Sequence, residues 1–306
     1  MIKLYLITGF LGSGKTTFLK NFVSLFDNER IALIINEFGK EGIDGELLSP
    51  LNIDISEINN GSIFCACRLE QFEQTLKEII KKEPKAIIIE ASGLSDPTSI
   101  RNILSDKEYD RIQYMGSICL VDAVNLKKVY STARVCKKQI AISDVAIINK
   151  TDLASQEDIE NTRNILLMQK PDIQIFETAF GRIKPEWIKN MTVLEYKSES
   201  NAIKTQDITL QKYLITVKDN FTYERLKKFI QMFIEDTYRI KGFVSIDGEI
   251  YFVDCVSNTI KIEKYNATVD SNRMGKIVVL SGKGMPTRRS ISEAIKWYAD
   301  EVECVQ

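Results

Sequence analysis

The chain has 306 residues, of which 44% are hydrophobic and 27% charged, and its 41 Lys and Arg nearly balance its 42 Asp and Glu. This composition supports a sizeable core and about two domains, and the balanced charge gives no electrostatic argument for nucleic acid or a membrane surface. The sequence contains no histidine, which excludes Ser-His-Asp triads, Cys-His dyads and His-ligated metal sites. Acid–base chemistry must therefore fall to carboxylates, lysines, cysteines or water.

Short apolar runs alternate with amphipathic stretches over about the first 180 residues. Continuous apolar runs are typical of strands buried on both faces, as in a parallel sheet, and an apolar stripe at steps of three and four from Leu69 to Ile80 predicts a helix between two of them. We therefore expect an α/β fold, a mostly parallel sheet with helices on both faces. The expected strands are Leu4–Thr8, Ile31–Ile35, Ile53–Ile58, Ala86–Ile89, Ser117–Val121, Val145–Ile148 and Ile173–Phe176.

The composition changes after residue 196. Residues 197–211 are mostly Lys, Ser, Glu, Asn, Thr and Gln, which predicts a linker between a domain of residues 1–196 and a smaller α+β domain of residues 212–306. Asp247-Gly248 favours a hairpin turn, and Ser290 with Glu293 predicts a capping box that opens the last helix. In this domain the expected strands are Tyr213–Val217, Phe243–Ile246, Ile250–Val253, Thr259–Glu263 and Ile277–Leu280, with a helical stripe from Leu226 to Ile234.

Residues 9–16 read Gly-Phe-Leu-Gly-Ser-Gly-Lys-Thr, between the first expected strand and a helical stretch. Glycines allow backbone N–H groups to turn toward phosphate oxygens, and the N-terminus of the following helix favours the same anion. Lys15 is expected to reach the β- and γ-phosphates, and the Thr16 hydroxyl to ligate Mg²⁺. The pattern predicts a nucleoside triphosphate site formed by Gly9, Gly12, Ser13, Gly14, Lys15, Thr16 and Thr17.

Asn149-Lys150-Thr151-Asp152 follows the expected strand Val145–Ile148. A carboxylate at Asp152 can accept two hydrogen bonds from the N1–H and amine of guanine, a donor pair that adenine lacks. Asn149 can donate to N7, and the stem of Lys150 can lie along the base. At the carboxyl end of a late strand, in a chain with a phosphate loop, this element predicts GTP as the nucleotide.

Two further strands end in carboxylates. Glu90 ends the run that begins at Ala86 and precedes Gly93 by three residues, so Glu90 is expected to hold Mg²⁺ and the Gly93 N–H to follow the γ-phosphate. Glu37 follows the second strand and opens a glycine-containing stretch suited to a nucleotide-dependent switch. For Glu37, a magnesium ligand and a solvated turn residue are equally good interpretations.

Together these residues resemble the CobW-like branch of the P-loop GTPases that also include the HypB and UreG metallochaperones. The resemblance rests on residues 8–17, 36–39, 90–97 and 149–152, and it covers most of the first 180 residues. The glutamate of Glu90-x-x-Gly93, where most GTPases have aspartate, is distinctive of this group. In the second domain, residues 239–242 resemble the shorter Arg-x-Lys-Gly element of the family. The resemblance implies GTP hydrolysis coupled to delivery of a metal ion, often zinc, to a client protein.

The family also implies a Cys-x-Cys-Cys metal motif, and the sequence departs from it at that place. Only Cys65 aligns with one of the three thiols, and Cys67 lies just beyond the motif. Cysteines at i and i+2 of an extended segment point the same way, so both thiolates could reach one soft ion. Two thiolates leave a zinc shell open, to be completed by Glu37, Glu41, Asp44, water or a partner. Burial as small hydrophobes, or a redox pair, are the alternatives.

The leading hypothesis is a slow Mg²⁺-dependent GTPase in which Lys15, Thr16 and Glu90 serve catalysis and whose nucleotide state is coupled to zinc-type metal delivery or metallocofactor assembly. Its expected partner is a client metalloprotein or assembly factor, with a homodimer left open and no nucleic acid or membrane. Six cysteines and no signal peptide favour reduced thiols in the cytoplasm. A small-molecule P-loop kinase and a GTP-gated protein-binding module without a metal role are the alternatives.

Overall fold

The structure is a computed structural model that describes residues 1–26, 29–37, 54–59, 69–195, 210–256, 259–267, 269 and 273–306, with the backbone alone at 37, 57–59 and 210. Its contacts divide into two compact units, residues 1–207 and 208–306, which are described separately. Of the predicted linker, residues 197–209 lie outside this description, and Leu210 and Gln211 begin a strand. Among the described residues, no helix combines the length and apolar character that crossing a membrane requires.

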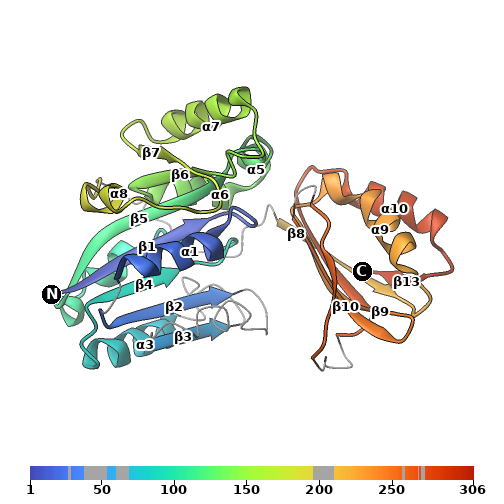
Figure 1. Cartoon of the computed structure of the whole chain (residues 1–306), viewed down its shortest axis with the longest axis horizontal. Coiled ribbons are helices and arrows are strands. Elements are labelled where there is room, and N and C mark those ends of the chain that lie inside the picture. Colours follow the sequence, from blue (N-terminus) through green and yellow to red (C-terminus); the bar gives the residue numbers. More distant parts are fainter. Residues whose placement is uncertain are drawn as a thin grey trace. The chain divides into compact units, whose positions relative to one another are not determined.

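The first unit contains a parallel sheet with strand order β3-β2-β4-β1-β5-β6-β7 (Figure 1). Every strand pair in the described part of this sheet is parallel, and β1 lies near the centre, between β4 and β5. The strands are β1 Ile2–Gly9, β2 Ile31–Glu37, β3 Asp54–Asn59, β4 Ala86–Glu90, β5 Ile112–Asp122, β6 Val145–Asn149 and β7 Gln174–Glu177. The predicted α/β fold is confirmed.

Helices cover both faces of this sheet. Alternate residues of a strand point to opposite sides, and in β1 the residues on both sides are apolar and pack against helices. One core packs even-numbered residues of β1, such as Leu4 and Leu6, against Phe72 and Leu76 of a helix. The other packs Tyr5 and Ile7 with Phe18, Leu19 and Phe22 of the first helix. The helices are α1 Lys15–Val23, α3 Leu69–Lys81, α4 Ile100–Leu104, α5 Leu126–Thr132, α6 Arg134–Ile142, α7 Gln156–Gln169 and α8 Pro185–Lys189, with 3₁₀ turns at Ser24–Phe26 and Lys107–Tyr109.

The register of the parallel strands brings their carboxyl ends to one edge of the sheet. Ile7 of β1 lies beside Glu90 of β4, and Asp122 of β5 lies beside Asn149 of β6. Helix α7 also begins as its sequence dictates, since Ser155 and Asp158 form a reciprocal capping box. The loops that follow the strands therefore meet around the start of α1, where ligands of open α/β sheets bind.

A buried ion pair fixes the chain where the described part of this unit ends. Asp144 is fully buried and accepts from the Ser117 N–H at 2.7 Å and the Leu194 N–H at 2.7 Å. Arg101 of α4 pairs with the same carboxylate at 2.9 Å, and its other terminal nitrogen donates to the Leu194 carbonyl. Segment 191–194 is thus held to α4 and β5 by charge-assisted hydrogen bonds.

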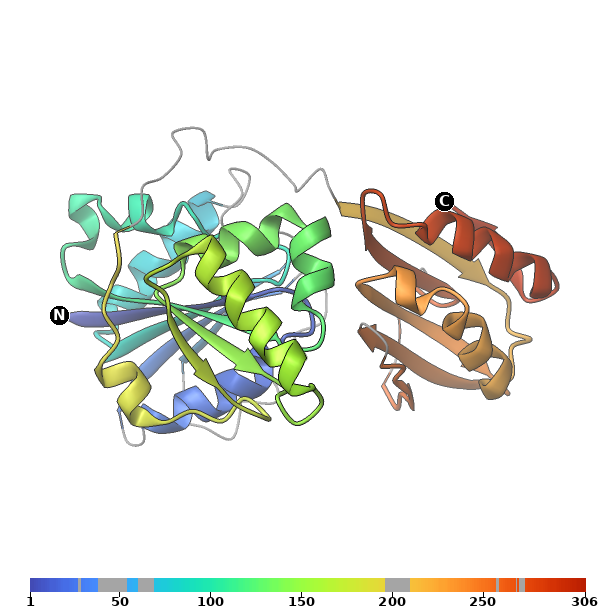
Figure 2. The same ribbon diagram turned by 90° about the horizontal axis from the view of Figure 1, so that it is seen from above.

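The second unit is an antiparallel sheet with strand order β11-β10-β9-β12-β8-β13. Helices α9 and α10 lie on the same side of this sheet (Figures 1 and 2), and Phe229 and Ile291 of these helices enter its core. The elements are β8 Leu210–Val217, α9 Tyr223–Gln231, the 3₁₀ turn Ile234–Asp236, β9 Arg239–Ile246, β10 Glu249–Val256, β11 Ile262–Lys264, β12 Lys276–Gly282, α10 Thr287–Trp297 and β13 Val302–Val305.

Two expectations for this unit are corrected. The predicted capping box is wrong, because α10 begins at Thr287 and Ser290 lies inside it, where its hydroxyl donates to Asp236 Oδ2 at 2.5 Å. Glu293 pairs instead with Lys296 one turn later. Strand β13 was not expected, because Glu303 interrupts its short apolar stretch and the strand has only four residues. The predicted hairpin is present, with Asp247 at φ 52° and Gly248 at φ 80°.

Candidate functional site

The phosphate loop connects β1 to α1 and depends on glycine at its turn into the helix. Gly14 has φ 96°, and a Cβ built on it would lie 2.3 Å from Asn149 Nδ2, so no other residue fits without displacing that side chain. The Ser13 hydroxyl is buried and has no hydrogen-bond partner within the described part of the chain. Buried hydroxyls are normally paired, so the loop fits a ligand with oxygen acceptors.

Lys15 is positioned by the main chain of its own loop. Its Nζ donates to the carbonyls of Gly9 at 3.0 Å and Phe10 at 3.2 Å, and the residue is 9% exposed. These bonds place the ammonium at the mouth of the loop, beside the N-terminus of α1, where positive charge favours a phosphate. Thr16, the next residue, is half-buried and Thr17 is exposed.

Asn149, at the end of β6, links the phosphate loop to a second loop. Its Nδ2 donates to the Ser13 carbonyl at 2.9 Å, and its Oδ1 accepts from the Gly181 N–H at 3.0 Å. The carboxamide is 2% exposed. The sequence suggested only that this residue donates to the base, whereas the structure shows that both ends of its side chain brace the main chain.

Lys150 follows in a conformation that is uncommon outside glycine, with φ 63°. Its Nζ contacts Asp122 Oδ2 at 2.6 Å, and Asp122 Oδ1 accepts from the Val124 and Asn125 N–H groups at 3.0 and 3.2 Å. Left-handed backbone at a non-glycine residue costs roughly 1–2 kcal/mol and persists where the surroundings fix it. Asp122, which sequence analysis did not single out, therefore holds the Lys150 side chain along the site.

The loop after β7 was also missed by sequence analysis. Asn21 of α1 donates to the carbonyls of Phe180 and Gly181 at 3.2 and 2.8 Å, and a Cβ on Gly181 would lie 2.7 Å from the Phe18 nitrogen. The Thr151 N–H donates to the Thr178 carbonyl at 3.3 Å, which places this loop beside the exposed Asp152 segment. In the sequence, Thr-Ala-Phe-Gly follows an apolar strand, but this local pattern does not show that Asn21 and Asn149 bind its main chain.

Glu90 and Gly93 reach the same edge of the sheet. Glu90 is 5% exposed and lies beside Ile7, two residues before the phosphate loop begins. A Cβ on Gly93 would lie 2.8 Å from the Leu11 nitrogen, so the main chain at Gly93 packs directly on the phosphate loop. Ser95 donates to Asn36 Oδ1 at 3.0 Å, which ties this loop to the end of β2. The Glu37 side chain lies outside the described residues.

The predicted thiol site, Cys65 and Cys67 with Glu41 and Asp44, lies outside the described residues. In the part that is described, no group of three or more Cys, Asp or Glu side chains is arranged to hold a metal ion. Cys119 and Cys136 are buried, and burial raises the pKa of Cys119 to about 12 and also raises that of Cys136. Burial likewise raises the pKa of Cys255 to about 11, whereas Cys304 is exposed. Cys119, Cys136 and Cys255 thus pack among the buried side chains of their units.

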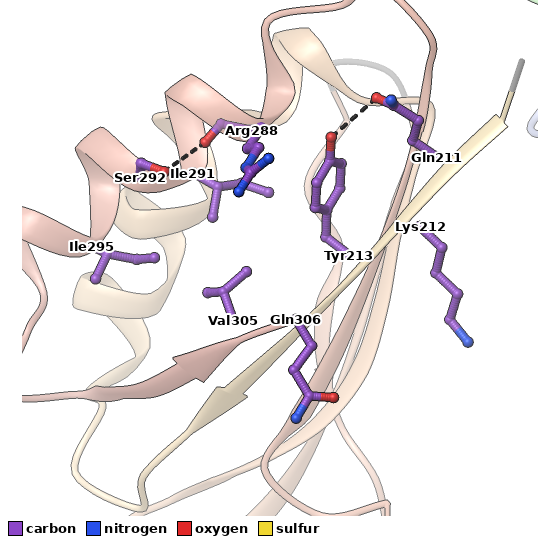
Figure 3. A pocket seen from close by; sticks show the side chains of 9 residues that line it. All are labelled: Gln211, Lys212, Tyr213, Arg288, Ile291, Ser292, Ile295, Val305 and Gln306. Atoms are coloured by element: carbon purple, nitrogen blue, oxygen red, sulfur yellow. Dashed lines mark hydrogen bonds between the residues drawn. The ribbon is translucent and has the colours of Figure 1, made fainter.

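A separate cavity of about 560 Å³ lies within the second unit, between α10 and the strands β8 and β13 (Figure 3). Ile291, Ile295 and Val305 contribute apolar surface to it, and Arg288 is the cation that faces it from α10. The Tyr213 hydroxyl donates to Gln211 Oε1 at 3.0 Å along one wall. The residues that line this cavity include none of the predicted nucleotide-binding residues. The cavity is therefore distinct from the predicted nucleotide site.

Each of the two units matches a known protein family. The family described as CobW/HypB/UreG, nucleotide-binding domain, matches residues 3–177, and the cobalamin synthesis protein cobW C-terminal domain matches residues 210–296. The first match spans more than half of the chain. It includes the phosphate loop, Glu90 and the Asn149–Asp152 element, and the second includes all of β9.

Individual relatives carry names related to zinc. The zinc chaperone YeiR of Escherichia coli is 30% identical over 187 residues, which is 60% of this chain and 57% of YeiR. The zinc chaperone CobW of Pseudomonas aeruginosa is 25% identical over 297 residues, covering 80% of this chain and 77% of that protein. The zinc-regulated GTPase metalloprotein activator 1 of Schizosaccharomyces pombe is 27% identical over 192 residues, 58% of this chain and 46% of its own length. The chain thus spans only about half the length of some of these relatives.

Proposed function

Because the chain belongs to the CobW/HypB/UreG family, we propose that it binds GTP with Mg²⁺, hydrolyses it slowly and couples its nucleotide state to delivery of a zinc-type metal ion. The observation that carries the nucleotide part is the hydrogen bond from Asn149 to Ser13, which joins the guanine element to the phosphate loop. The names of the relatives, zinc chaperones and a metalloprotein activator, support the metal part.

The proposed reaction assigns a role to each group around the loop. Lys15 and the N–H groups near Gly14 stabilise charge on the phosphates, and Asp152 selects guanine. Thr16, Glu90 and Glu37 are the groups that would hold Mg²⁺, and a bound ion would neutralise charge on the phosphate oxygens. In the described part of the chain, no side chain is placed as an arginine finger, so we expect slow intrinsic turnover that a partner or the metal accelerates.

The partner proposed is a client metalloprotein or assembly factor, with a homodimer left open, and the proposed location is the cytoplasm. A small-molecule kinase is not favoured, because the guanine element is integrated with the phosphate loop and the relatives carry chaperone and GTPase names. A protein-binding module without a metal role is not favoured by those names either. Cys65 and Cys67 remain the proposed metal-holding thiols.

A competition titration of Zn²⁺ tests the coupling. We expect zinc affinity to differ about 5- to 150-fold between a non-hydrolysable GTP analogue and GDP, and linkage requires zinc to change the affinity for the analogue by the same factor. The double variant Cys65→Ser/Cys67→Ser should abolish this difference and spare GTP affinity measured without metal. Cys304→Ser is the matched control, since this thiol is exposed in the second unit, and it should behave as the wild type.

The outcomes separate the two parts of the proposal. Equal zinc affinity in every nucleotide state, in both wild type and the double variant, would contradict metal coupling but leave nucleotide binding intact. A wild-type protein that prefers ATP to GTP would contradict the guanine assignment. Anaerobic purification keeps the thiols reduced, so that oxidation does not imitate a loss of metal affinity.

A further inference from the structure

Gln139 is a fully buried polar residue that the proposed reaction does not yet use. It lies on α6, and its Nε2 donates to the carbonyls of Gly93 at 3.2 Å and Ser95 at 3.1 Å. One side chain thus holds two carbonyls of the loop that follows Glu90. Residue 139 and this loop are more than 40 positions apart in the chain, so the contact brings α6 to the back of the phosphate site.

The loop that Gln139 holds lies against the phosphate loop. The main chain of Gly93 is so close to Leu11 that a Cβ on it would lie 2.8 Å from the Leu11 nitrogen. Gly93 is buried, and its N–H donates to no group in the described part of the chain. A buried N–H without an acceptor is rare and costs about 1–3 kcal/mol, so this donor suits an acceptor that the ligand supplies.

The chemistry of Gln139 matches the two carbonyls that it holds. Both neighbours of its amide are carbonyl oxygens, so only the NH₂ end can face them, and Oε1 is left buried without a partner among the described residues. An apolar side chain of similar volume would avoid that unpaired acceptor, but it would leave both loop carbonyls without this donor. The donor to Gly93 and Ser95 is therefore the property that distinguishes glutamine at this position.

We propose that Gln139 is a positioning residue for GTP hydrolysis, which holds the main chain of Gly93–Ser95 so that the Gly93 N–H can donate to the γ-phosphate. The inference rests on the proposed GTPase function. Ser95 is held from the other side by its bond to Asn36, so α6 and β2 together fix the loop before nucleotide binds. Fixing a donor in advance lowers the cost of ordering it around the transition state.

The test uses the full chain and the variant Gln139→Met, which keeps the volume and removes the donor. We expect kcat for GTP to fall about 10- to 100-fold, as small displacements of a phosphate-binding group do. GDP affinity should stay within about 2-fold, and the preference for a non-hydrolysable GTP analogue over GDP should drop roughly 10-fold, because only the analogue carries a γ-phosphate. Gln169→Met is the matched control, since Gln169 of α7 accepts from Tyr130 outside this loop.

Each result decides the matter. Wild-type kcat and wild-type preference in Gln139→Met would overturn the proposal, and so would equal losses of GDP and analogue affinity, which indicate a general structural effect. Circular dichroism and a thermal melt check the fold; should Gln139→Met not fold, Gln139→Asn withdraws the same donor by one methylene and is read in the same way. Absence of GTP hydrolysis and of guanine nucleotide binding in the wild type would instead reject the proposed function.

Discussion

Asn149 donates from Nδ2 to the carbonyl of Ser13 at 2.9 Å, so the first residue of the guanine element is also part of the wall of the phosphate loop. The other end of the same carboxamide accepts from Gly181 at 3.0 Å. The segments proposed to read the base and to bind phosphate therefore form one hydrogen-bonded unit. A substitution in either segment should also affect the other. Their separate contributions to nucleotide binding can therefore be measured only with matched variants.

The proposed preference for guanine depends on Asp152. Replacing its carboxylate in Asp152→Asn should weaken GTP binding about 30- to 150-fold, because one charge-assisted contact is lost. The variant should gain affinity for xanthosine triphosphate, whose base presents an acceptor at position 2. Fluorescence titration with both nucleotides checks this, with Asp172→Asn, an exposed residue outside the site, as the control. Unchanged GTP affinity would show that Asp152 does not read the base.

The proposed stabilisation of phosphate charge depends on Lys15. Lys15→Ala should lower GTP turnover about 100-fold or more, because the ammonium held by the Gly9 and Phe10 carbonyls is removed from the γ-phosphate. Phosphate-release assays and a thermal melt distinguish lost chemistry from lost fold. Lys20→Ala changes the same helix near its other end and should retain turnover. Activity near the wild-type level in Lys15→Ala would mean that phosphate binds elsewhere.

The magnesium assignment depends on Glu90. Glu90→Gln keeps the shape of this buried side chain and removes its charge, so it should reduce Mg²⁺-dependent turnover more than nucleotide affinity. The measurement is the Mg²⁺ concentration that gives half-maximal GTP hydrolysis, which should rise. The exposed Glu157→Gln of α7 serves as the control. An unaltered Mg²⁺ requirement would remove Glu90 from the metal site.

The stability of the first unit depends on the buried pair of Asp144 and Arg101. Asp144→Ala should lower the free energy of unfolding by about 3–5 kcal/mol, because it leaves the buried Ser117 N–H and the partly buried donors of Arg101 and Leu194 without this acceptor. Removing the exposed partner of Arg30 in Asp54→Ala should cost less than about 1 kcal/mol. Urea denaturation of both variants makes the comparison, and similar losses would contradict it.

The thiols should differ in reactivity. The nucleophile in alkylation is the thiolate, and a raised pKa leaves a cysteine as the neutral thiol below that pKa. Because burial raises the pKa of Cys119 to about 12 and also that of Cys136, iodoacetamide at pH 8 should modify both only after unfolding. The exposed Cys304 should react in the native protein. Peptide mass mapping reads the result, and native labelling of Cys119 would contradict the burial described.

The features that sequence analysis predicted are those that short stretches of the sequence indicate by themselves. Apolar runs gave six of the seven strands of the first unit within a few residues of their starts, and the family assignment is confirmed. The longest discrepancy is β5, which begins at Ile112 rather than Ser117, because its first residues include the exposed Gln113 and do not form a continuous apolar run. The roles of Lys15, Thr16, Glu90 and Asp152 stay predictions, and Cys65 and Cys67 lie outside the described residues.

The features that were missed depend on partners far apart in the sequence. Nothing near Gln139 indicates that its amide meets Gly93, and nothing near Gly181 indicates that Asn21 and Asn149 bind its main chain. Strand β13 is paired by β8 almost ninety positions earlier, and its few apolar residues carry little pattern. Such contacts arise from the order of the strands in the sheet. A local sequence pattern does not indicate that order.

The central place of β1 in the sheet also sets an order of events during synthesis. The phosphate loop, residues 9–16, is synthesised well before the groups that surround it, Glu90, Asn149 and Gly181. Its nucleotide-binding conformation therefore waits for almost the whole first unit, since contacts of long sequence separation form late in folding. The proposed ligand GTP would stabilise only the folded state that binds it. It would therefore stabilise the completed unit but could not assist the first steps of its folding.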